Sequence, residues 1–229
     1  MAENDIKGQL HIVATPIGNL ADITIRALDT LRSVDLILCE DTRVTKRLLD
    51  AYEIETKTMS YHQHSTETKV GEIIALLQEG MHLALVTDAG TPGISDPGNM
   101  LISAVNQQTD IIVSPIPGAS AIVAALSISG FPTDKFLFLG FPPHKNKRNK
   151  FFKEVAEAQY TVAFYESCHR IDKALLQLQE VLPKGSLVCV CRELTKKFEQ
   201  IARGTIDEIL NIKTPAKGEF VLLVYNKKK

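Results

Sequence analysis

The sequence predicts two α/β domains, and three observations lead to this prediction. Apolar runs typical of buried strands alternate with helical segments along the chain. The length of 229 residues exceeds the roughly 150 residues of a typical single domain. The stretch ISGFPTDK, at residues 128–135, breaks any helix and is typical of a hinge. We therefore expect a first domain at residues 1–130 and a second at 131–229.

The first domain follows a strand and helix alternation that favours a mostly parallel sheet. Its apolar strands are nearly continuous, as in VDLILC, which is typical of strands covered by helices on both faces. We expect strands at residues 10–15, 34–40, near 58, 83–88 and 111–115, and helices at 21–32, 42–52, 66–79, after 97 and at 119–129.

The second domain repeats this alternation with shorter spacing. Strands are predicted at residues 136–140, 161–166, 186–191, 198–204 and 219–225, and helices near 150–158, 169–181 and 205–212. Two helix starts are marked by their residues. Either Gly118 or Ser120 begins the helix AIVAAL, and Thr205 begins IDEIL with Glu208 as its capping-box partner.

Composition excludes several classes of protein. Hydrophobic residues make up 45% and charged residues 23%, which is ordinary for a globular chain with a buried core. The N-terminal residues contain no secretion signal and no apolar run spans a bilayer, so we expect a cytoplasmic protein without a membrane segment. The formal net charge of −1 means that contact with nucleic acid needs a local basic patch.

The four cysteines are expected to be reduced packing residues. They show no CxxC pair and no spacing typical of zinc ligands. Cys189 and Cys191 share a face if LVCVC is a strand, but no third ligand lies nearby in the sequence. We therefore expect no metal.

The segment LALVTDAGTPGISDPG, at residues 83–98, is the strongest candidate for a ligand site. An apolar strand ends there in a turn rich in glycine, proline and aspartate. Glycines let the backbone approach a bound molecule, and open α/β sheets bind ligands at the carboxyl ends of their strands. The alternative is a tight strand-to-helix connection whose polar side chains are only solvated.

Three further segments follow predicted strands. TPIGNL has only Gly18 where a dinucleotide fold has GxGxxG, which disfavours NAD, FAD and an ordinary class I methyltransferase. CEDTR places Glu40, Asp41 and Arg43 at a strand end, where they either do chemistry or simply start a capped helix. PIPGASA combines small residues with a helix start, and either contacts a flat ring or only caps the helix.

A basic segment, PPHKNKRNKFFKE, is the best candidate for contact with phosphates. It contains Lys145, Lys147, Arg148, Lys150 and Lys153 beside two phenylalanines that could stack on nucleotides. The alternative is a solvated basic helix face with the phenylalanines in the core.

Several long motifs in the same order carry a resemblance that spans residues 10–224. They are CEDTR, VTDAGTPGISDPG, PIPGASA, FYESCHRI, CRELTKKFEQIARGTI and KGEFVLLV. Together they resemble the tetrapyrrole methylase family, in its ribosomal RNA branch. Tetrapyrrole-modifying relatives have a glycine-rich first loop, whereas TPIGNL matches the RNA branch.

The resemblance implies two α/β domains with a cleft between them for S-adenosylmethionine. It implies methylation of a cytidine ribose 2′-oxygen in small-subunit ribosomal RNA or the 30S particle, by a homodimer. The branch often continues into a helical tail, whereas this sequence ends at Lys229. The implied cofactor contacts, with Pro16 of the first turn included, are Pro16, Asp88, Gly90, Thr91, Pro92, Gly93, Ile94, Ser95, Asp96, Pro97, Ser120, Ala121, Tyr165, Lys217 and Gly218.

The chemistry of methyl transfer suggests roles for the charged residues. Alignment of nucleophile and methyl group and exclusion of water are the main requirements. We expect Glu40, Asp41 or Glu166 to receive or direct the hydroxyl proton, and Arg43 or Arg192 to hold phosphate. Two alternatives remain: methylation of a tetrapyrrole or other small molecule, and a ribosome-assembly module that keeps the cofactor site without turnover.

Overall fold

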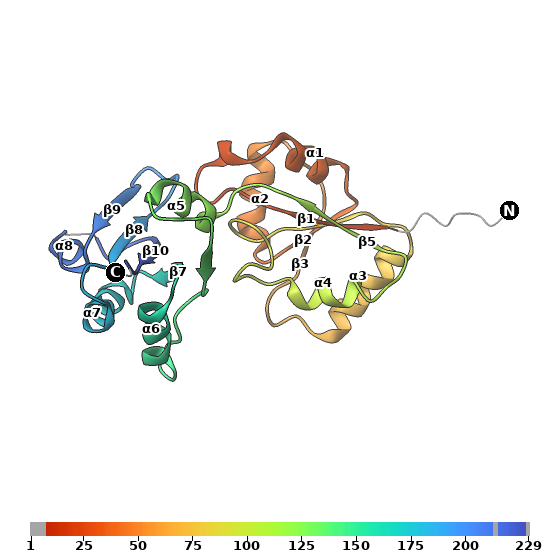
Figure 1. Cartoon of the computed structure of the whole chain (residues 1–229). Helices are drawn as coiled ribbons and strands as arrows, with labels where there is room; N and C mark the ends of the chain where they lie inside the picture. The colour runs from red at the N-terminus through yellow and green to blue at the C-terminus, as the bar shows by residue number, and fades with distance from the viewer. Residues whose placement is uncertain (1–7, 213–214, 228–229) are drawn as a thin grey trace. The chain divides into compact units, whose positions relative to one another are not determined.

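The chain folds into two compact α/β units, Met1–Ser120 and Ala121–Lys229 (Figure 1). The structure is a computed structural model that describes residues 8–212 and 215–227. Each unit contains one five-stranded sheet with helices packed against it, and this confirms the predicted fold class. No helix in the described part of the chain is long and apolar enough to cross a membrane.

The first unit is built on a parallel sheet, as the sequence predicts. The sheet has the order β3-β2-β4-β1-β5, and every strand pair is parallel. Its elements, with one 3-10 helix η1, are β1 (Gln9–Val13), η1 (Leu20–Asp22), α1 (Ile25–Ser33), β2 (Leu36–Cys39), α2 (Thr42–Ala51), β3 (Thr58–Ser60), α3 (Glu67–Gln78), β4 (Leu83–Leu85), α4 (Asn99–Val105) and β5 (Ile112–Ile116).

Helices cover both faces of this sheet, which explains its continuous apolar strands. Leu38 of β2 packs in a cluster with residues of α3 and α4, whereas its neighbour Ile37 packs with residues of α1 and α2. Successive side chains of a strand point to opposite faces, so both residues must be apolar. The carboxyl ends of β1, β2, β4 and β5 therefore meet at one edge, just beyond two buried cores.

The second unit has a mixed sheet with the order β6-β7-β10-β8-β9. Strands β6 and β7 are parallel, and the other pairs are antiparallel. Its elements are α5 (Ala121–Ser129), β6 (Phe136–Phe138), α6 (Arg148–Glu157), β7 (Thr161–Ser167), α7 (Ile171–Val181), β8 (Leu187–Arg192), β9 (Gln200–Gly204), α8 (Ile206–Asn211) and β10 (Glu219–Tyr225). Thr205 and Glu208 form the predicted capping box.

The division between the units lies before α5, whereas the sequence places it after Gly130. Helix α5 belongs with the second unit because it packs against β10 and β7. The side chain of Arg203 on β9 also donates to the carbonyl oxygen of Ile128, near the end of α5. A helix that follows the last strand of one sheet thus covers the next sheet.

Candidate active site

The candidate site of the first unit lies where β4 ends and the glycine-rich turn, residues 88–98, begins. The turn is fastened to the end of β1: the amide of Thr15 donates to the carbonyl of Gly90 at 2.9 Å, and the amide of Gly90 donates back at 3.1 Å. The buried Thr15 hydroxyl donates to the carbonyl of Thr87 at 3.0 Å. These contacts hold the first turn residues against the sheet edge.

Glycines in this turn have conformations that other residues rarely adopt. Gly90, Gly93 and Gly98 have φ angles of +84°, +82° and +141°. A Cβ atom on Gly98 would also lie 3.1 Å from a methyl group of Leu85. The turn therefore folds back tightly over the end of β4, in backbone conformations that glycine adopts without strain.

A second predicted segment meets the turn. The Thr91 hydroxyl donates to the carbonyl of Ala119 at 3.3 Å, which places residues 118–120, after β5, beside the turn. A Cβ atom on Gly118 would lie 3.0 Å from the Cβ of Ala14, so the chain passes closely over β1 there. The structure thus brings the predicted contact Ser120 to the neighbourhood of Thr91, whereas Ala121 begins α5 of the second unit.

A cavity of about 170 Å³ adjoins the turn. It is smaller than the roughly 300 to 1,000 Å³ of a typical ligand pocket, so it can hold only part of a ligand. It contains the predicted contacts Pro16 and Asp88, and its full lining is Thr15, Pro16, Leu20, Val44, Thr45, Arg47, Leu48, Thr87 and Asp88.

Carboxylates gather at the same edge of the sheet. The amide of Asp41 donates to Oδ1 of Asp88 at 3.2 Å, which joins the end of β2 to the end of β4. The Thr87 hydroxyl donates to Oε2 of Glu40 at 3.4 Å. The carboxyl of Asp96 is also hydrogen-bonded to this hydroxyl. Predicted residues from CEDTR and from the glycine-rich turn therefore form one acidic cluster, defined here as Glu40, Asp88 and Asp96.

The pKa values of all three carboxyl groups in the acidic cluster are raised, so their ionisation is energetically unfavourable. The pKa of Asp96 is raised to about 6, mainly by burial and also by the charges of Glu40 and Asp88, against a lowering by the Thr87 hydroxyl. Burial is also the main cause that raises the pKa of Glu40 and of Asp88. Within residues 8–212 and 215–227, no ion pair reaches these three carboxylates. A bound cation would therefore stabilise their charged forms.

Asp41 differs from this cluster because it is already paired. Its carboxylate accepts from the Arg43 amide at 2.8 Å, which caps α2, and from the Arg43 guanidinium at 2.6 Å. These hydrogen bonds hold the pKa of Asp41 well below its usual range. The Arg43 side chain is 86% exposed, so the pair lies on the surface, where it adds little stability.

In the second unit, Glu166 is part of a buried ionic network. Its Oε2 accepts from Arg148 at 2.8 Å, and its Oε1 lies 3.0 Å from Nε of Arg170. The amide of Ser167 also donates to Oε1 at 2.8 Å, and the Glu166 side chain has no exposed surface. Both carboxylate oxygens are thus used inside the fold.

Arg192 likewise lies inside the fold rather than on a phosphate-binding surface. Its Nε donates to the carbonyl of Lys217 at 2.6 Å, and its Nη1 donates to the carbonyl of Phe198 at 3.0 Å. The residue is only 8% exposed. Glu166 of β7 and Arg192 of β8 both pair with Phe220 of β10, which lies between the two strands. Strand β10 therefore separates Glu166 from Arg192.

The other predicted contacts of the second unit are fixed by packing. The half-buried ring of Tyr165 lies between Phe138 and Phe141, with centroid distances of 5.2 and 5.1 Å. Gly218 has a φ angle of +92°, and a Cβ atom there would lie 2.5 Å from the carboxyl group of Glu193. The position after the exposed residue Lys217 therefore has room for glycine only.

The basic segment is only partly available to a phosphate. Arg148 is 3% exposed because it pairs with Glu166, and Phe151 and Phe152 are buried in the core at 8% and 1% exposure. The expectation that Arg148 and these rings contact nucleotides is therefore wrong. The remaining lysines, at 145, 147, 150 and 153, are exposed.

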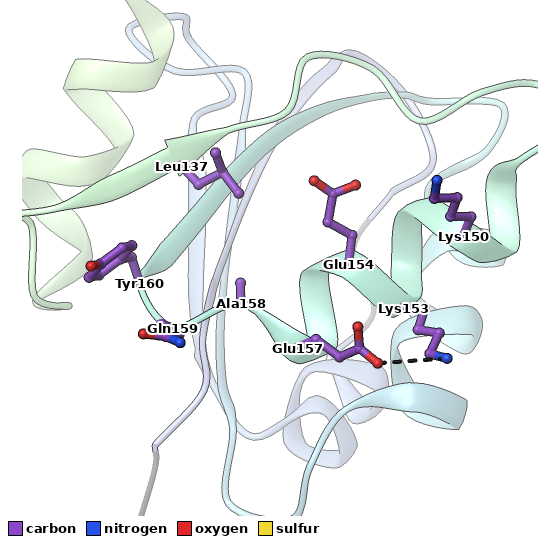
Figure 2. Close-up of a pocket in the computed structure, with 8 residues that line it drawn as sticks. All are labelled: Leu137, Lys150, Lys153, Glu154, Glu157, Ala158, Gln159 and Tyr160. Atoms are coloured by element: carbon purple, nitrogen blue, oxygen red, sulfur yellow. Dashed lines mark ion pairs between the residues drawn. The ribbon is translucent and has the colours of Figure 1, made fainter.

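A pocket of about 670 Å³ lies beside the exposed face of α6 (Figure 2). Lys150 and Lys153 line it together with Glu154 and Glu157, and Leu137 and Tyr160 complete its apolar side. Lys153 pairs with Glu157 at 3.7 Å. The positive charge of this face is thus partly neutralised by its own glutamates.

Some contributions to the site had no clear signal in the sequence. Thr15 and Thr87 are buried and orient the turn through their hydroxyls, but a threonine at a strand end is too common to attract notice. Phe198 was expected inside a strand, whereas it is 65% exposed in the loop before β9.

The two cysteines of β8 lie as the sequence predicts. Cys189 and Cys191 share a face of β8 as predicted, with their sulfur atoms 3.7 Å apart. Among the residues that the structure describes, no group of three or more His, Cys, Asp or Glu is placed to hold a metal ion.

Comparison with known proteins identifies relatives over nearly the whole chain. Residues 9–210 match the family described as Tetrapyrrole (Corrin/Porphyrin) Methylases. A protein of Halalkalibacterium halodurans named Ribosomal RNA small subunit methyltransferase I is 47% identical, over 97% of this chain and 77% of that protein. A protein of Leptospira biflexa with the same name is 41% identical, over 100% of this chain and 95% of that protein.

Solved structures share the fold. Uroporphyrin-III-C-methyltransferase from Thermus thermophilus has a TM-score of 0.67 at 17% identity, covering 96% of this chain and 95% of that chain. Cobalt precorrin-4 methyltransferase has a TM-score of 0.68 at 19% identity, covering 94% of each chain.

Proposed function

Because the chain belongs to the tetrapyrrole (corrin/porphyrin) methylase family, we propose that it is an S-adenosylmethionine-dependent methyltransferase of small-subunit ribosomal RNA. The names of relatives at 41% and 47% identity support the RNA substrate. We further propose, from the motifs of the RNA branch, that the methyl acceptor is the ribose 2′-oxygen of a cytidine and that the enzyme is a homodimer. The glycine-rich turn beside the acidic cluster is the single observation that carries the proposal.

The residues present fit this cofactor. S-adenosylmethionine carries positive charge on its sulfonium and amino groups, and the carboxylates of the acidic cluster form no ion pair among the described residues. Gly90, Gly93 and Gly98 have no side chain of their own that would stand between the turn and a ligand. When bound, the cofactor supplies an activated methyl group. The residues proposed to hold it are Pro16, Asp88 to Pro97 and Ser120, with Ala121, Tyr165 and the backbone near Lys217 and Gly218 from the second unit.

Among the candidate proton acceptors, Glu40 fits best. A general base works best when its pKa lies near the operating pH, and the pKa of Glu40 is raised mainly by burial. Asp41 is a weaker base because the Arg43 amide and guanidinium lower its pKa. Glu166 uses both oxygens within its buried network. We therefore assign the proton of the ribose hydroxyl to Glu40.

Phosphate contacts are proposed for exposed cations. Arg43 is 86% exposed and can rotate from Asp41 toward a phosphate. Lys145, Lys147 and Lys150 are exposed and can contact the RNA backbone. Arg192 is not assigned this role because two carbonyl oxygens already accept from its guanidinium.

A labelled-methyl assay tests this function. Purified small subunits from cells that lack this protein are incubated with the enzyme and tritiated S-adenosylmethionine. We expect label in ribosomal RNA, in a dinucleotide that survives alkaline hydrolysis, because a methylated 2′-oxygen cannot attack the adjacent phosphate. Label in a base would contradict the ribose assignment. Cofactor binding without transfer to RNA would favour a non-catalytic assembly module, and transfer to a porphyrin instead would favour a small-molecule enzyme.

A further inference from the structure

The loop between β8 and β9, residues 193–199, presents an exposed aromatic ring beside lysines. Phe198 is 65% exposed, and the Lys197 ammonium lies 5.7 Å from the centroid of its ring. We propose that Phe198 is a stacking site for an unpaired nucleobase, with Lys197 and Lys217 contacting the flanking phosphates. This inference rests on the proposed function and identifies the RNA as single-stranded where it meets this loop.

The loop is held in an unusual conformation. Glu193 and Thr195 have φ angles of +51° and +66°, and the left-handed region is rare for a β-branched residue such as Thr195. The Thr195 amide donates to the carboxylate of Glu199 at 2.7 Å. Lys196 binds Glu193 and Glu219, each at 3.1 Å. Strain of this kind persists only when surrounding contacts impose it, and it concentrates at binding sites.

Arg192 connects this loop to the segment that precedes β10. The carbonyl oxygens of Phe198 and Lys217 accept from the same guanidinium, at 3.0 and 2.6 Å. The backbones of Phe198 and Lys217 therefore lie side by side. Arg192 acts as a positioning residue, because it fixes an exposed ring and an exposed lysine next to each other.

The local charges favour a nucleic acid as the ligand. Glu193 and Glu219 are paired with Lys196, and the carboxylate of Glu199 accepts from the Thr195 amide. Among the described residues, Lys197 and Lys217 form no ion pair. A base offers a flat face to an aromatic ring and brings phosphates to nearby lysines, whereas lysine is depleted in interfaces between proteins.

Fluorescence measurements with short RNA test this site. The probes are a single-stranded oligonucleotide containing 2-aminopurine, whose fluorescence falls on stacking, and a duplex of the same length. Phe198→Ala is expected to weaken single-strand binding by about 5-fold to 150-fold, the range that corresponds to loss of one base stack. It should abolish the quenching and leave duplex binding unchanged. Phe198→Tyr keeps a ring and should retain both signals.

Matched controls separate stacking from other roles. Phe136→Ala removes another exposed phenylalanine, 44% exposed on β6, and should leave binding unchanged. Arg192→Lys keeps the positive charge but loses the planar guanidinium that holds both carbonyl oxygens, so it should weaken single-strand binding and leave duplex binding unchanged. Wild-type affinity and quenching in Phe198→Ala would overturn the proposal. A smaller sedimentation coefficient for Phe198→Ala would also overturn it, because Phe198 would then contact a second copy of the chain.

Methyl transfer by the wild type is measured in parallel. If the wild type labels ribosomal RNA while Phe198→Ala binds and labels it equally well, the stacking site is wrong and the proposed function stands. If the wild type neither binds the oligonucleotide nor labels RNA, the proposed function fails and the stacking site fails with it.

Discussion

The backbone amide of Asp41 donates to the carboxylate of Asp88 at 3.2 Å. This hydrogen bond joins the end of β2 to the end of β4, which are neighbours in the first sheet although 47 residues separate the two aspartates. A parallel sheet places the carboxyl ends of its strands at one edge. The CEDTR motif and the glycine-rich turn therefore lie together at one edge of the sheet.

Removal of the Asp88 charge should weaken cofactor binding without weakening the fold. Charge-assisted hydrogen bonds contribute about 1.5 to 3 kcal/mol, so Asp88→Asn is expected to raise the Kd for S-adenosylmethionine about 10-fold to 150-fold in calorimetry. Burial disfavours the ionised Asp88, so urea unfolding should show equal or greater stability. The control is Asp29→Asn, at an exposed position of α1, which should leave the affinity for S-adenosylmethionine unchanged. Unchanged affinity in Asp88→Asn would contradict the site.

Stability should depend on pH through Asp96. Its pKa is raised from 3.8 to about 6, mainly by burial, so the native state holds a proton that the unfolded state releases. The free energy of unfolding is therefore expected to fall as pH rises from about 4 to about 6. Asp96→Asn should reduce this slope and make the protein more stable than the wild type at pH 7.5. Urea unfolding at pH 4.5 and 7.5 measures both effects, and an unchanged slope in the variant would contradict the assignment.

Two glycines with left-handed backbone should respond differently to alanine. Gly130→Ala introduces only backbone strain, because no atom lies within 4 Å of its new Cβ, and should cost about 1 to 2 kcal/mol. Gly98→Ala adds contact with Leu85 at 3.1 Å and should cost more. Thermal unfolding and calorimetry measure stability and cofactor affinity. Only Gly98→Ala should weaken cofactor binding, and equal effects of the two substitutions on affinity would contradict the role of the turn.

The fold could be predicted closely because the hydrophobic pattern and the positions of turn-forming residues indicate the same elements. The strand LALVTD and its stop at the glycines could be recognised from sequence, since a buried strand and a turn have distinct residue types. The division of the chain was harder to place. The apolar sequence of helix α5 is compatible with packing in either unit. Only its packing on β10 and β7 shows that it belongs to the second unit.

The site was predicted less completely than the fold. Sequence pattern identified Glu40 and Asp88 as polar residues at strand ends, but it could not show which charged residues are paired. Glu166 and Arg192 have the types expected of functional residues, yet both are used inside the fold. Such pairings depend on contacts between segments far apart in the chain, such as Arg192 with Lys217.

Glu40 and Glu166 should respond differently to conversion to an amide. Glu40→Gln is expected to lower kcat by 10² to 10⁴, as loss of a general base does, with little change in stability. Glu166→Gln leaves the buried guanidinium of Arg148 and the partly buried guanidinium of Arg170 without their carboxylate, and should lower the free energy of unfolding by up to about 3 to 5 kcal/mol. Single-turnover methyl transfer and urea unfolding measure the two quantities.

The kcat values of Glu40→Gln and Glu166→Gln together test which carboxylate accepts the proton. At a temperature where Glu166→Gln is fully folded, its kcat should stay within a few-fold of the wild type. A large loss of kcat in folded Glu166→Gln, together with normal turnover in Glu40→Gln, would reverse the assignment of the proton acceptor.

The exposed lysines before and within α6 should affect RNA binding only. Conversion of Lys145, Lys147 and Lys150 to glutamine is expected to weaken RNA binding and to reduce the slope of log Kd against log salt by up to about 2, as for three lost phosphate contacts. Cofactor affinity should not change. Lys46→Gln, which removes a lysine paired with Asp50, is the control. A parallel loss of cofactor affinity would indicate a folding defect and contradict the RNA role.

The position of a bound cofactor product tests the central claim most directly. A crystal structure with S-adenosylhomocysteine should show the ligand against the backbone of residues 90–97 and close to Asp88. A ligand bound away from this turn, or no heat of binding in calorimetry with the wild-type protein, would contradict the account.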